Sequence, residues 1–218
     1  MLRASGALIR ARNHSTRAKA SELVMLLDNK SHGRVVDALR EALAAGAAAS
    51  ILTGDLSLFA WDELKKEIGE LSTTRLLLSP VMMDADAKGP SLLGGSEERR
   101  FRNTLSGPRI ARKMDEWLQR SSVEVRVTSA MVPHSLYHAG KKNGEAVAVQ
   151  GSSSFTCPGF GLTPSDRFEL NTLFADAASA NGLLAFFDSL WAAGGLAHDA
   201  KEQLCSQLRT VYEPRAPQ

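Results

Sequence analysis

The stretch HSLYHAGKKNGEAVAVQGSSSFT, residues 134–156, decides the fold of this chain. Two apolar runs flank a Lys-Lys-Asn-Gly segment, and Asn143–Gly144 between such runs is a strong short-range signal for a β-hairpin. A Gly-Ser run follows the second strand. Hydroxyl side chains and backbone N–H groups at the end of a strand are typical of an anion cradle. The alternative is that these serines cap the next turn or helix.

Working outward from the hairpin, strand patterns alternate with helical patterns, which favours a layered α/β domain. The expected strands outside the hairpin are residues 49–56, 74–81, 123–129 and 166–174. The expected helices are residues 33–46, 59–71, 97–120 with an interruption at Gly107–Pro108, 174–195 and 197–211, and residues 83–97 are expected to form a loop.

Composition narrows the class of protein. The chain has 218 residues, of which 44% are hydrophobic and 23% charged, as in ordinary globular domains. A formal net charge of +2 is too small to indicate nucleic-acid binding by itself. The two cysteines, Cys157 and Cys205, have no metal-ligand spacing, so we expect a reducing compartment. No apolar run is long enough to predict a membrane span.

The first 21 residues differ from the remainder. They contain five basic residues and no acid, which is typical either of a disordered basic leader or of an organelle targeting segment. We therefore divide the chain into a leader, 1–21, and a single domain, 22–218. The expected location is the cytoplasm, or the mitochondrion if the leader is a targeting segment.

Most of residues 24–172 resemble the phospholipase D superfamily, in particular its domains beside DNA helicases and in bacterial restriction and defence proteins. The resemblance is carried by LLDNKS (26–31), ILTGDLSLFAWDELKKEI (51–68), TRLLLS (74–79), EERRFRNTLSGPRIARKMDEWLQR (97–120), VEVRV (123–127), the 134–156 stretch and FELN (168–171). It implies a layered α/β/α phospholipase D-like domain with a mixed sheet, in which the β-hairpin carries the motif histidine. GSSSFT and its distance from that histidine are the most specific part.

The resemblance also implies a chemistry without metal or cofactor. In such enzymes a neutral histidine of a His-x-Lys motif attacks phosphorus, and a second histidine protonates the leaving oxygen. A Gly-Ser-x-Asn motif and the lysine hold the phosphate oxygens as charge develops. A chain with one motif carries half of this site, so the resemblance implies a homodimer.

Matched residue by residue, the motif is degraded in this chain. His134 falls at the histidine position, Ser152 at the serine position and Ser154 at the asparagine position. Leu136 occupies the lysine position and offers neither charge nor a donor to phosphate. The motif is thus HxL in place of HxK, and the sequence predicts that Leu136→Lys would restore activity.

The remaining candidates follow from the same comparison. Glu169 matches a polar residue that follows the motif and is expected to orient a histidine as part of the catalytic group. Ser153 and Asn171 are expected to bind phosphate. His138 and Lys141 form an alternative register, although residues three apart on a strand point to opposite faces unless Gly140 kinks the chain.

A basic helical region is the candidate nucleic-acid contact. Its residues are Arg102, Arg109, Arg112 and Lys113. Nearby acids also allow an ordinary solvated helix face, and the functional alternative is contact with a DNA or RNA backbone.

Three functions remain open at this point. The favoured one is a phospholipase D-like module that binds nucleic acid or another phosphodiester, with a degenerate site, acting with a helicase or larger complex. The second is an active metal-independent nuclease or phosphodiesterase that works through a phosphohistidine as a homodimer. The third is a structural subunit of a larger assembly.

Overall fold

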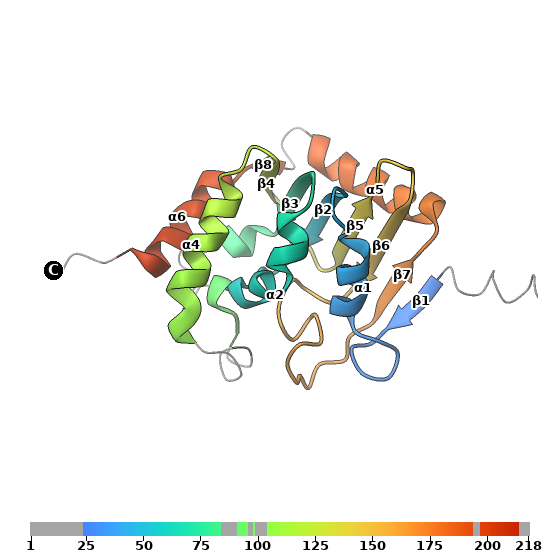
Figure 1. The fold of residues 1–218 in the computed structure, drawn as a ribbon, viewed down its shortest axis with the longest axis horizontal. Helices are drawn as coiled ribbons and strands as arrows, with labels where there is room; N and C mark the ends of the chain where they lie inside the picture. The colour runs from blue at the N-terminus through green and yellow to red at the C-terminus, as the bar shows by residue number, and fades with distance from the viewer. Residues whose placement is uncertain (1–23, 84–90, 96–97, 99–103, 194–196, 214–218) are drawn as a thin grey trace, which may run out of the picture.

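The computed structural model describes residues 24–83, 91–95, 98, 104–193 and 197–213, and these form one eight-stranded mixed sheet with helices on both faces (Figure 1). The strand order is β1-β7-β6-β5-β2-β3-β4-β8. The strands are β1 Val24–Leu27, β2 Ala48–Thr53, β3 Thr73–Leu78, β4 Val123–Thr128, β5 Ser135–Gly140, β6 Ala146–Gly151, β7 Asn171–Phe174 and β8 Ala197–Asp199.

Strands β2, β3 and β4 are parallel to one another, whereas all other neighbouring strands pair antiparallel. Both faces of a parallel sheet must be covered, which explains the apolar runs at residues 51–52 of β2 and 76–78 of β3. Their carboxyl ends meet at one edge of the sheet. The start of β5 and the end of β6 lie at the same edge, because both strands run antiparallel within their pairs.

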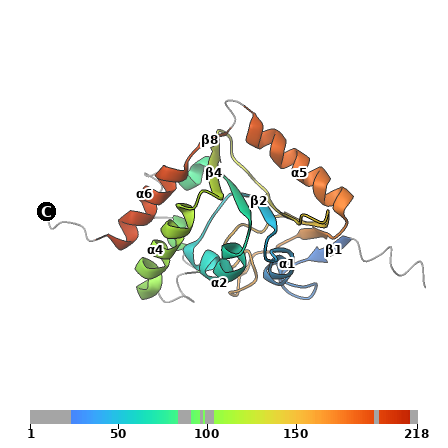
Figure 2. The same ribbon diagram turned by 45° about the horizontal axis from the view of Figure 1, so that its top comes forward.

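Helices cover the two faces unequally. The α-helices are α1 Val35–Ala42, α2 Leu58–Gly69, α4 Gly107–Leu118, α5 Ala177–Ala192 and α6 Lys201–Tyr212, with short 3-10 helices at Pro80–Met83, Ser91–Leu93 and Thr104–Ser106. Figure 2 shows α1, α2 and α4 on one side of the sheet and α5 on the other. Helix α6 packs beside α4.

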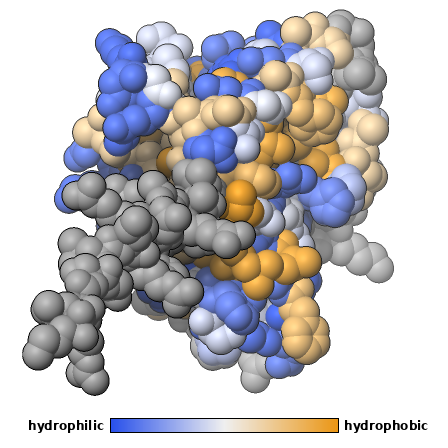
Figure 3. All heavy atoms as spheres, turned by 90° about the vertical axis from the view of Figure 1, so that its right-hand side faces the viewer, coloured by the Kyte–Doolittle hydropathy of each residue, from blue (hydrophilic) through white to orange (hydrophobic). Residues whose placement is uncertain are grey.

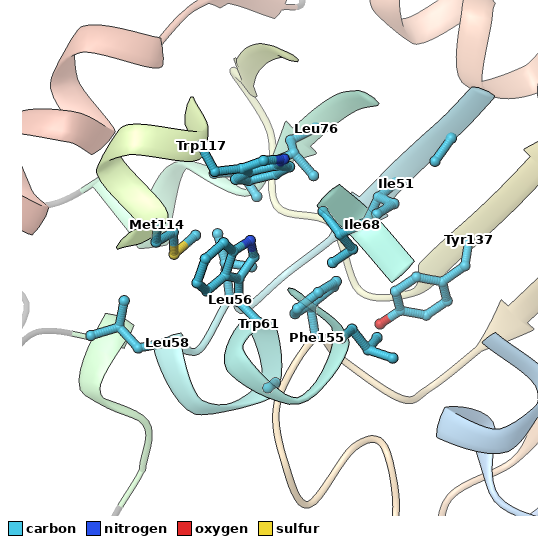
Figure 4. Close-up of a cluster of buried hydrophobic side chains, with 14 of the residues drawn as sticks. Ile51, Leu56, Leu58, Trp61, Ile68, Leu76, Met114, Trp117, Tyr137 and Phe155 are labelled. Atoms are coloured by element: carbon cyan, nitrogen blue, oxygen red, sulfur yellow. The ribbon is translucent and has the colours of Figure 1, made fainter. Parts of the chain in front are cut away.

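The larger core lies between the sheet and the α1, α2 and α4 layer (Figure 4). Trp61 of α2 and Trp117 of α4 pack with ring centroids 5.7 Å apart, and Tyr137 of β5 packs against Phe155 and Phe160. A smaller apolar cluster lies beneath α5. Neighbouring β5 residues point to opposite faces, so Tyr137 belongs to the larger core and Leu136 to the smaller cluster.

The predicted hairpin is confirmed. Its turn is closed by a hydrogen bond from Lys141 N–H to the Glu145 carbonyl at 2.8 Å. Gly144 has φ of +89°, a left-handed conformation that glycine adopts without strain. The Asn143 side chain accepts from Glu145 N–H at 3.1 Å, which adds a local turn bond.

Several element boundaries differ from the prediction, and two strands, β1 and β8, were missed; helix α4 begins at Gly107, where an interruption of a longer helix was expected. Residues 166–170 are not in a strand, and β7 begins at Asn171. Residues 197–199 form edge strand β8 against β4, not the start of a helix; the Asp199 carboxylate accepts from Lys201 N–H at 3.0 Å where α6 begins. Strand β1 was not predicted, because four residues next to the basic leader give too short a pattern.

The expected leader, 1–21, and Arg102 lie outside the described residues. Within the described part of the chain, no helix is long and apolar enough to cross a membrane.

Candidate functional site

The Gly-Ser run forms a polar network at the sheet edge where the central strands end. The Ser152 hydroxyl donates to Glu169 Oε2 at 2.5 Å, and the Ser153 hydroxyl donates to the same oxygen at 3.2 Å. Ser152 also forms two hydrogen bonds with the segment before β7. Its backbone N–H donates to the Leu170 carbonyl, and its Oγ accepts from Leu170 N–H at 2.9 Å. The carboxylate therefore sits directly beside the motif serine.

Ser153 is fully buried, and two asparagines satisfy its polar atoms. Asn171 Oδ1 accepts from Ser153 N–H at 3.0 Å, and Asn171 Nδ2 donates to Ser153 Oγ at 2.9 Å. Asn29 Nδ2 donates to the same Oγ at 3.3 Å. These bonds join the loop after β1, the end of β6 and the start of β7 into one network.

Asn29 was not predicted as a site residue, although it lies in the LLDNKS segment. Its φ of 59° turns the chain sharply after β1. Its side chain donates to the Gly159 carbonyl at 2.8 Å and accepts from Val35 N–H at 2.8 Å. The signal available in the sequence was an asparagine after a short apolar run, since asparagine tolerates the left-handed conformation better than most residues.

Gly151 is required by the close approach of β7. A Cβ at Gly151 would overlap the Leu170 carbonyl and Asn171 Oδ1. The glycine of the Gly-Ser run therefore allows Asn171 to reach Ser153.

A second group of polar side chains lies under the serine run. Tyr137 hydroxyl donates to the Ser153 carbonyl at 2.7 Å, and burial raises the Tyr137 pKa well above its usual 10.0. Thr53 Oγ1 lies 3.3 Å from Ser135 Oγ and accepts from Phe155 N–H at 3.0 Å. The β5 residues on the same face as this network are therefore Ser135 and Tyr137.

The predicted histidine lies on the opposite face of β5. His134 directly precedes β5, one residue before the last ladder pair, Ser135–Gly151, and lies on the α5 side of the sheet with Leu136. His134 is exposed and lines an apolar cavity of about 440 Å³ between α5 and the β4–β5 connection. Among the described residues, no hydrogen bond or ion pair joins His134 to the serine network.

Leu136 lies in the apolar cluster beneath α5. It is 2% exposed and clusters with Leu52, Leu77 and Phe187. The position that the resemblance assigns to lysine therefore belongs to the core.

The alternative pair, His138 and Lys141, lies where β5 ends and β2 begins, at the opposite end of the strands from the serine network. Both line a second cavity beside α5, far along β5 from Ser135. The structure brings Ser152, Ser153, Glu169 and Asn171 together and leaves both histidines and Lys141 outside this network. Ser154 is half-buried beside it, and its carbonyl accepts from Thr156 N–H at 2.8 Å.

Three predicted nucleic-acid contacts form an exposed basic face on α4. Arg109, Arg112 and Lys113 are exposed, and the Arg112 guanidinium lies 5.3 Å from the Tyr212 ring centroid. In the sheet, β5, β2 and β3 separate the strand next to α4 from the strand that carries the serines. The basic face is thus a separate surface.

Within the described ranges, no three His, Cys, Asp or Glu side chains are grouped closely enough to hold one metal ion.

No protein-family profile matches the chain, and no curated protein is similar to it. Among solved structures, the chain is similar to phosphatidylserine synthase of Haemophilus influenzae Rd KW20, a member of the phospholipase D superfamily, with a TM-score of 0.54, 9% identity and coverage of 88% of this chain. The chain spans 43% of that protein's length.

A second similar structure is that of TrmBL2, an archaeal chromatin protein with a novel mode of DNA binding. Its TM-score is 0.41 with 15% identity, over 82% of this chain and 55% of that one, which is too low to carry an argument. The similarity to the synthase concerns the fold alone. Together with the mixed eight-stranded sheet and its helices on both faces, it shows that this chain has a phospholipase D-like α/β fold.

Proposed function

We propose that this chain is a phospholipase D-like module that binds the phosphodiester backbone of nucleic acid and does not cleave it efficiently, acting with a helicase or in a larger complex. The observation that carries the proposal is the burial of Leu136 beneath α5. Phosphoryl transfer needs preorganised donors on the phosphate oxygens, and losing one costs roughly 10²–10³ in rate. A core leucine supplies none.

The position of Glu169 also favours slow chemistry and weak phosphate binding. Its carboxylate accepts from Ser152 and Ser153 hydroxyls, so both donors are directed at an anion already present in the protein. A phosphate at Ser152 has to approach that charge. Binding therefore depends on additional cations elsewhere.

The exposed basic face of α4 supplies such cations. Arg109, Arg112 and Lys113 lie three and four residues apart, which places them on one helix face. A nucleic acid chain has one phosphate per nucleotide, so it can contact both α4 and the serine edge across several strands of the sheet. This makes a polymer a better ligand than an isolated phosphodiester.

We further propose that two copies pair at the serine edge, as a single-motif chain requires. The residues that flank Glu169 support this. Phe168 is 92% exposed and Leu170 is 62% exposed. Two large apolar side chains exposed beside a polar network are typical of an interaction surface.

The experiment that tests binding is fluorescence anisotropy with labelled single- and double-stranded DNA and RNA across a salt series. Each basic side chain that neutralises a phosphate contributes about 0.9 to the slope of log affinity against log salt on duplex DNA. Replacing Arg109, Arg112 and Lys113 by Ala should therefore lower that slope by up to about 2.7. The matched control replaces Lys65, Lys66 and Lys142, which are exposed on other elements, and should leave it unchanged.

An unchanged slope in the α4 variant would remove this surface from the proposal. Absence of binding to every nucleic acid tested would favour a structural subunit of a larger assembly.

A further inference from the structure

The cavity at the sheet edge opposite the serines has the features of a binding site. It has a volume of about 380 Å³, in the range of small-molecule pockets. It lies where β2, β3 and β6 begin and where β5 ends, beneath the first turns of α5. Its polar lining consists of Ser50, Thr73, Arg75, His138, Lys141 and Asn181, with Glu145 also present.

His138 brings a buried polar atom without a hydrogen bond to the wall of this cavity. The residue is 4% exposed, and its Nε2 forms no hydrogen bond. A Cβ placed on Gly140, which also lines the cavity, would lie 3.2 Å from His138 Cε1 and 4.0 Å from Nε2. The edge of the imidazole that carries Nε2 therefore lies beside Gly140, at the wall of the cavity. An unpartnered buried ring nitrogen costs stability, which a ligand oxygen at this position would recover.

Two cations beside His138 keep unused donors. Arg75 donates from Nε and Nη2 to Ser50 Oγ and its Nη1 is ion-paired with Asp188, so part of its five-donor fork remains available. Its guanidinium is held in place by Phe187, whose ring centroid is 5.0 Å away. Lys141 donates to Glu145 at 2.9 Å and has two further N–H groups.

We propose that this cavity binds the phosphate group of a small organic phosphate, with His138 Nε2, Arg75, Lys141 and the Asn181 amide as donors. Convergent donors from a strand, a hairpin and a helix suit a tetrahedral oxyanion with oxygens in several directions. The cavity is larger than an inorganic phosphate, which indicates an organic part on the ligand. This site is separate from the serine edge and does not depend on nucleic-acid binding there.

The acids near His138 do not prevent this binding. Asp188 of α5 is paired with Arg75 at 2.8 Å and Glu145 of the hairpin is paired with Lys141, so each acid already has a cation. The group expected to take up a proton when phosphate binds is therefore the His138 imidazole. Burial, together with the Arg75 charge, lowers the pKa of His138, while Asn181 and Asp188 raise it. A bound dianion favours the protonated ring, so binding should tighten as pH falls.

The test is NMR of the protein with ¹⁵N-labelled histidine, titrated with adenosine 5′-monophosphate, inorganic phosphate and adenosine. We expect the monophosphate to shift the His138 imidazole signals and raise its pKa. Inorganic phosphate should bind more weakly, and adenosine, which lacks the anion, should have no effect. Comparing the three separates the phosphate group from the organic part of the ligand.

Variants locate the site. Lys141→Ala and Asn181→Leu alter exposed side chains and should fold normally, and Lys141→Ala should weaken the monophosphate affinity by roughly tenfold. Lys142→Ala is the matched control, because this lysine does not line the cavity. Ser152→Ala should leave the affinity unchanged, which separates this result from any result at the serine edge.

No shift of the His138 signals with the monophosphate would overturn the proposal. Equal losses of affinity in Lys141→Ala and Lys142→Ala would also overturn it, since the effect would then reflect surface charge and not this cavity.

Discussion

Asn171 holds Ser153 by two hydrogen bonds, one from the Ser153 backbone N–H to Asn171 Oδ1 at 3.0 Å and one from Asn171 Nδ2 to Ser153 Oγ at 2.9 Å. Both residues are buried. The pair fixes the serine run against the start of β7. Figure 3 views the molecule from the side on which β1 and β7 lie, where hydrophobic surface adjoins hydrophilic surface.

Replacing Asn171 by Ala should destabilise the protein by about 1–3 kcal/mol, because it leaves the buried Ser153 N–H without an acceptor. The free energy of unfolding from urea denaturation measures this. Thr172→Ala, one residue along the same strand and partly exposed, is the control and should cost much less. A decrease below about 0.5 kcal/mol for Asn171→Ala would show that the bond pair does not hold this region.

Gly151→Ala should also destabilise the protein, by about 1–3 kcal/mol, because the new methyl group meets the Leu170 carbonyl and Asn171. Gly182→Ala in α5 is the opposite case, since nothing lies within 4 Å of the position that its Cβ would occupy. Because Gly182 is an exposed position within a helix, Gly182→Ala should raise the free energy of unfolding by roughly 0.5–1 kcal/mol. Thermal unfolding of the two variants distinguishes them, and equal changes would contradict the close approach of β7.

Glu169→Gln should strengthen nucleic-acid binding. It removes a negative charge beside Ser152 while keeping an oxygen that accepts from the serine hydroxyls. The repulsion between two unit charges 4 Å apart in water is about 1 kcal/mol. Removing this repulsion between Glu169 and a phosphate should therefore lower the dissociation constant by about fivefold. Anisotropy at low salt measures it, with Asp166→Asn as an exposed control. Weaker binding by Glu169→Gln would indicate that the carboxylate contributes directly to the site.

Leu136→Lys should destabilise the protein and should not restore hydrolysis. The side chain is 2% exposed beneath α5, where an ammonium group would be desolvated without a partner. This burial argues against the rescue that the motif comparison predicts. Leu136→Met, which conserves volume, should cost less than about 1.5 kcal/mol. A stable Leu136→Lys protein that cleaves nucleic acid would refute this account of the position.

Stability should fall as pH drops through the range in which His138 titrates. Burial and Arg75 lower its pKa in the folded state below the usual 6.5, so the unfolded chain takes up a proton that the folded chain does not. Stability is therefore full above the unfolded pKa and decreases as pH falls toward the folded pKa. Urea denaturation in phosphate-free buffer, from about pH 8 to about pH 5, measures this dependence.

His138→Gln should reduce the pH dependence, whereas His198→Gln, at an exposed position on β8, should leave it unchanged. An identical pH profile for the wild type and His138→Gln would contradict the shifted titration.

The hairpin and the alternation of strands and helices could be predicted because they depend on local patterns. Asn143–Gly144 sets the turn, the apolar runs of β2 and β3 reflect burial on both faces, and β4 shows an alternating pattern. The ends of β7 and the existence of β8 could not, because they depend on which distant segment supplies the hydrogen-bond partner. Ser152 hydrogen-bonds to the backbone of Leu170, just before β7, and Arg126 of β4 pairs with Asp199 of β8.

The site could be predicted only in part for the same reason. Ser152, Ser153, Glu169 and Asn171 follow the motif in sequence and are together in the structure. The face of β5 that meets the serines depends on how the hairpin packs between α5 and the larger core. The motif comparison could therefore identify His134, but it could not predict on which side of the sheet its side chain lies. Asn29 reaches Ser153 from 124 residues away, a contact that no local pattern encodes.

Incubation of the purified protein with labelled single- and double-stranded DNA and RNA in EDTA, with binding and cleavage followed in the same samples, tests the central claim most directly. We predict salt-sensitive binding by the wild type, and no cleavage above the His134→Ala control. Rapid cleavage by the wild type that His134→Ala abolishes would contradict the account and show that the chain is an active metal-independent nuclease.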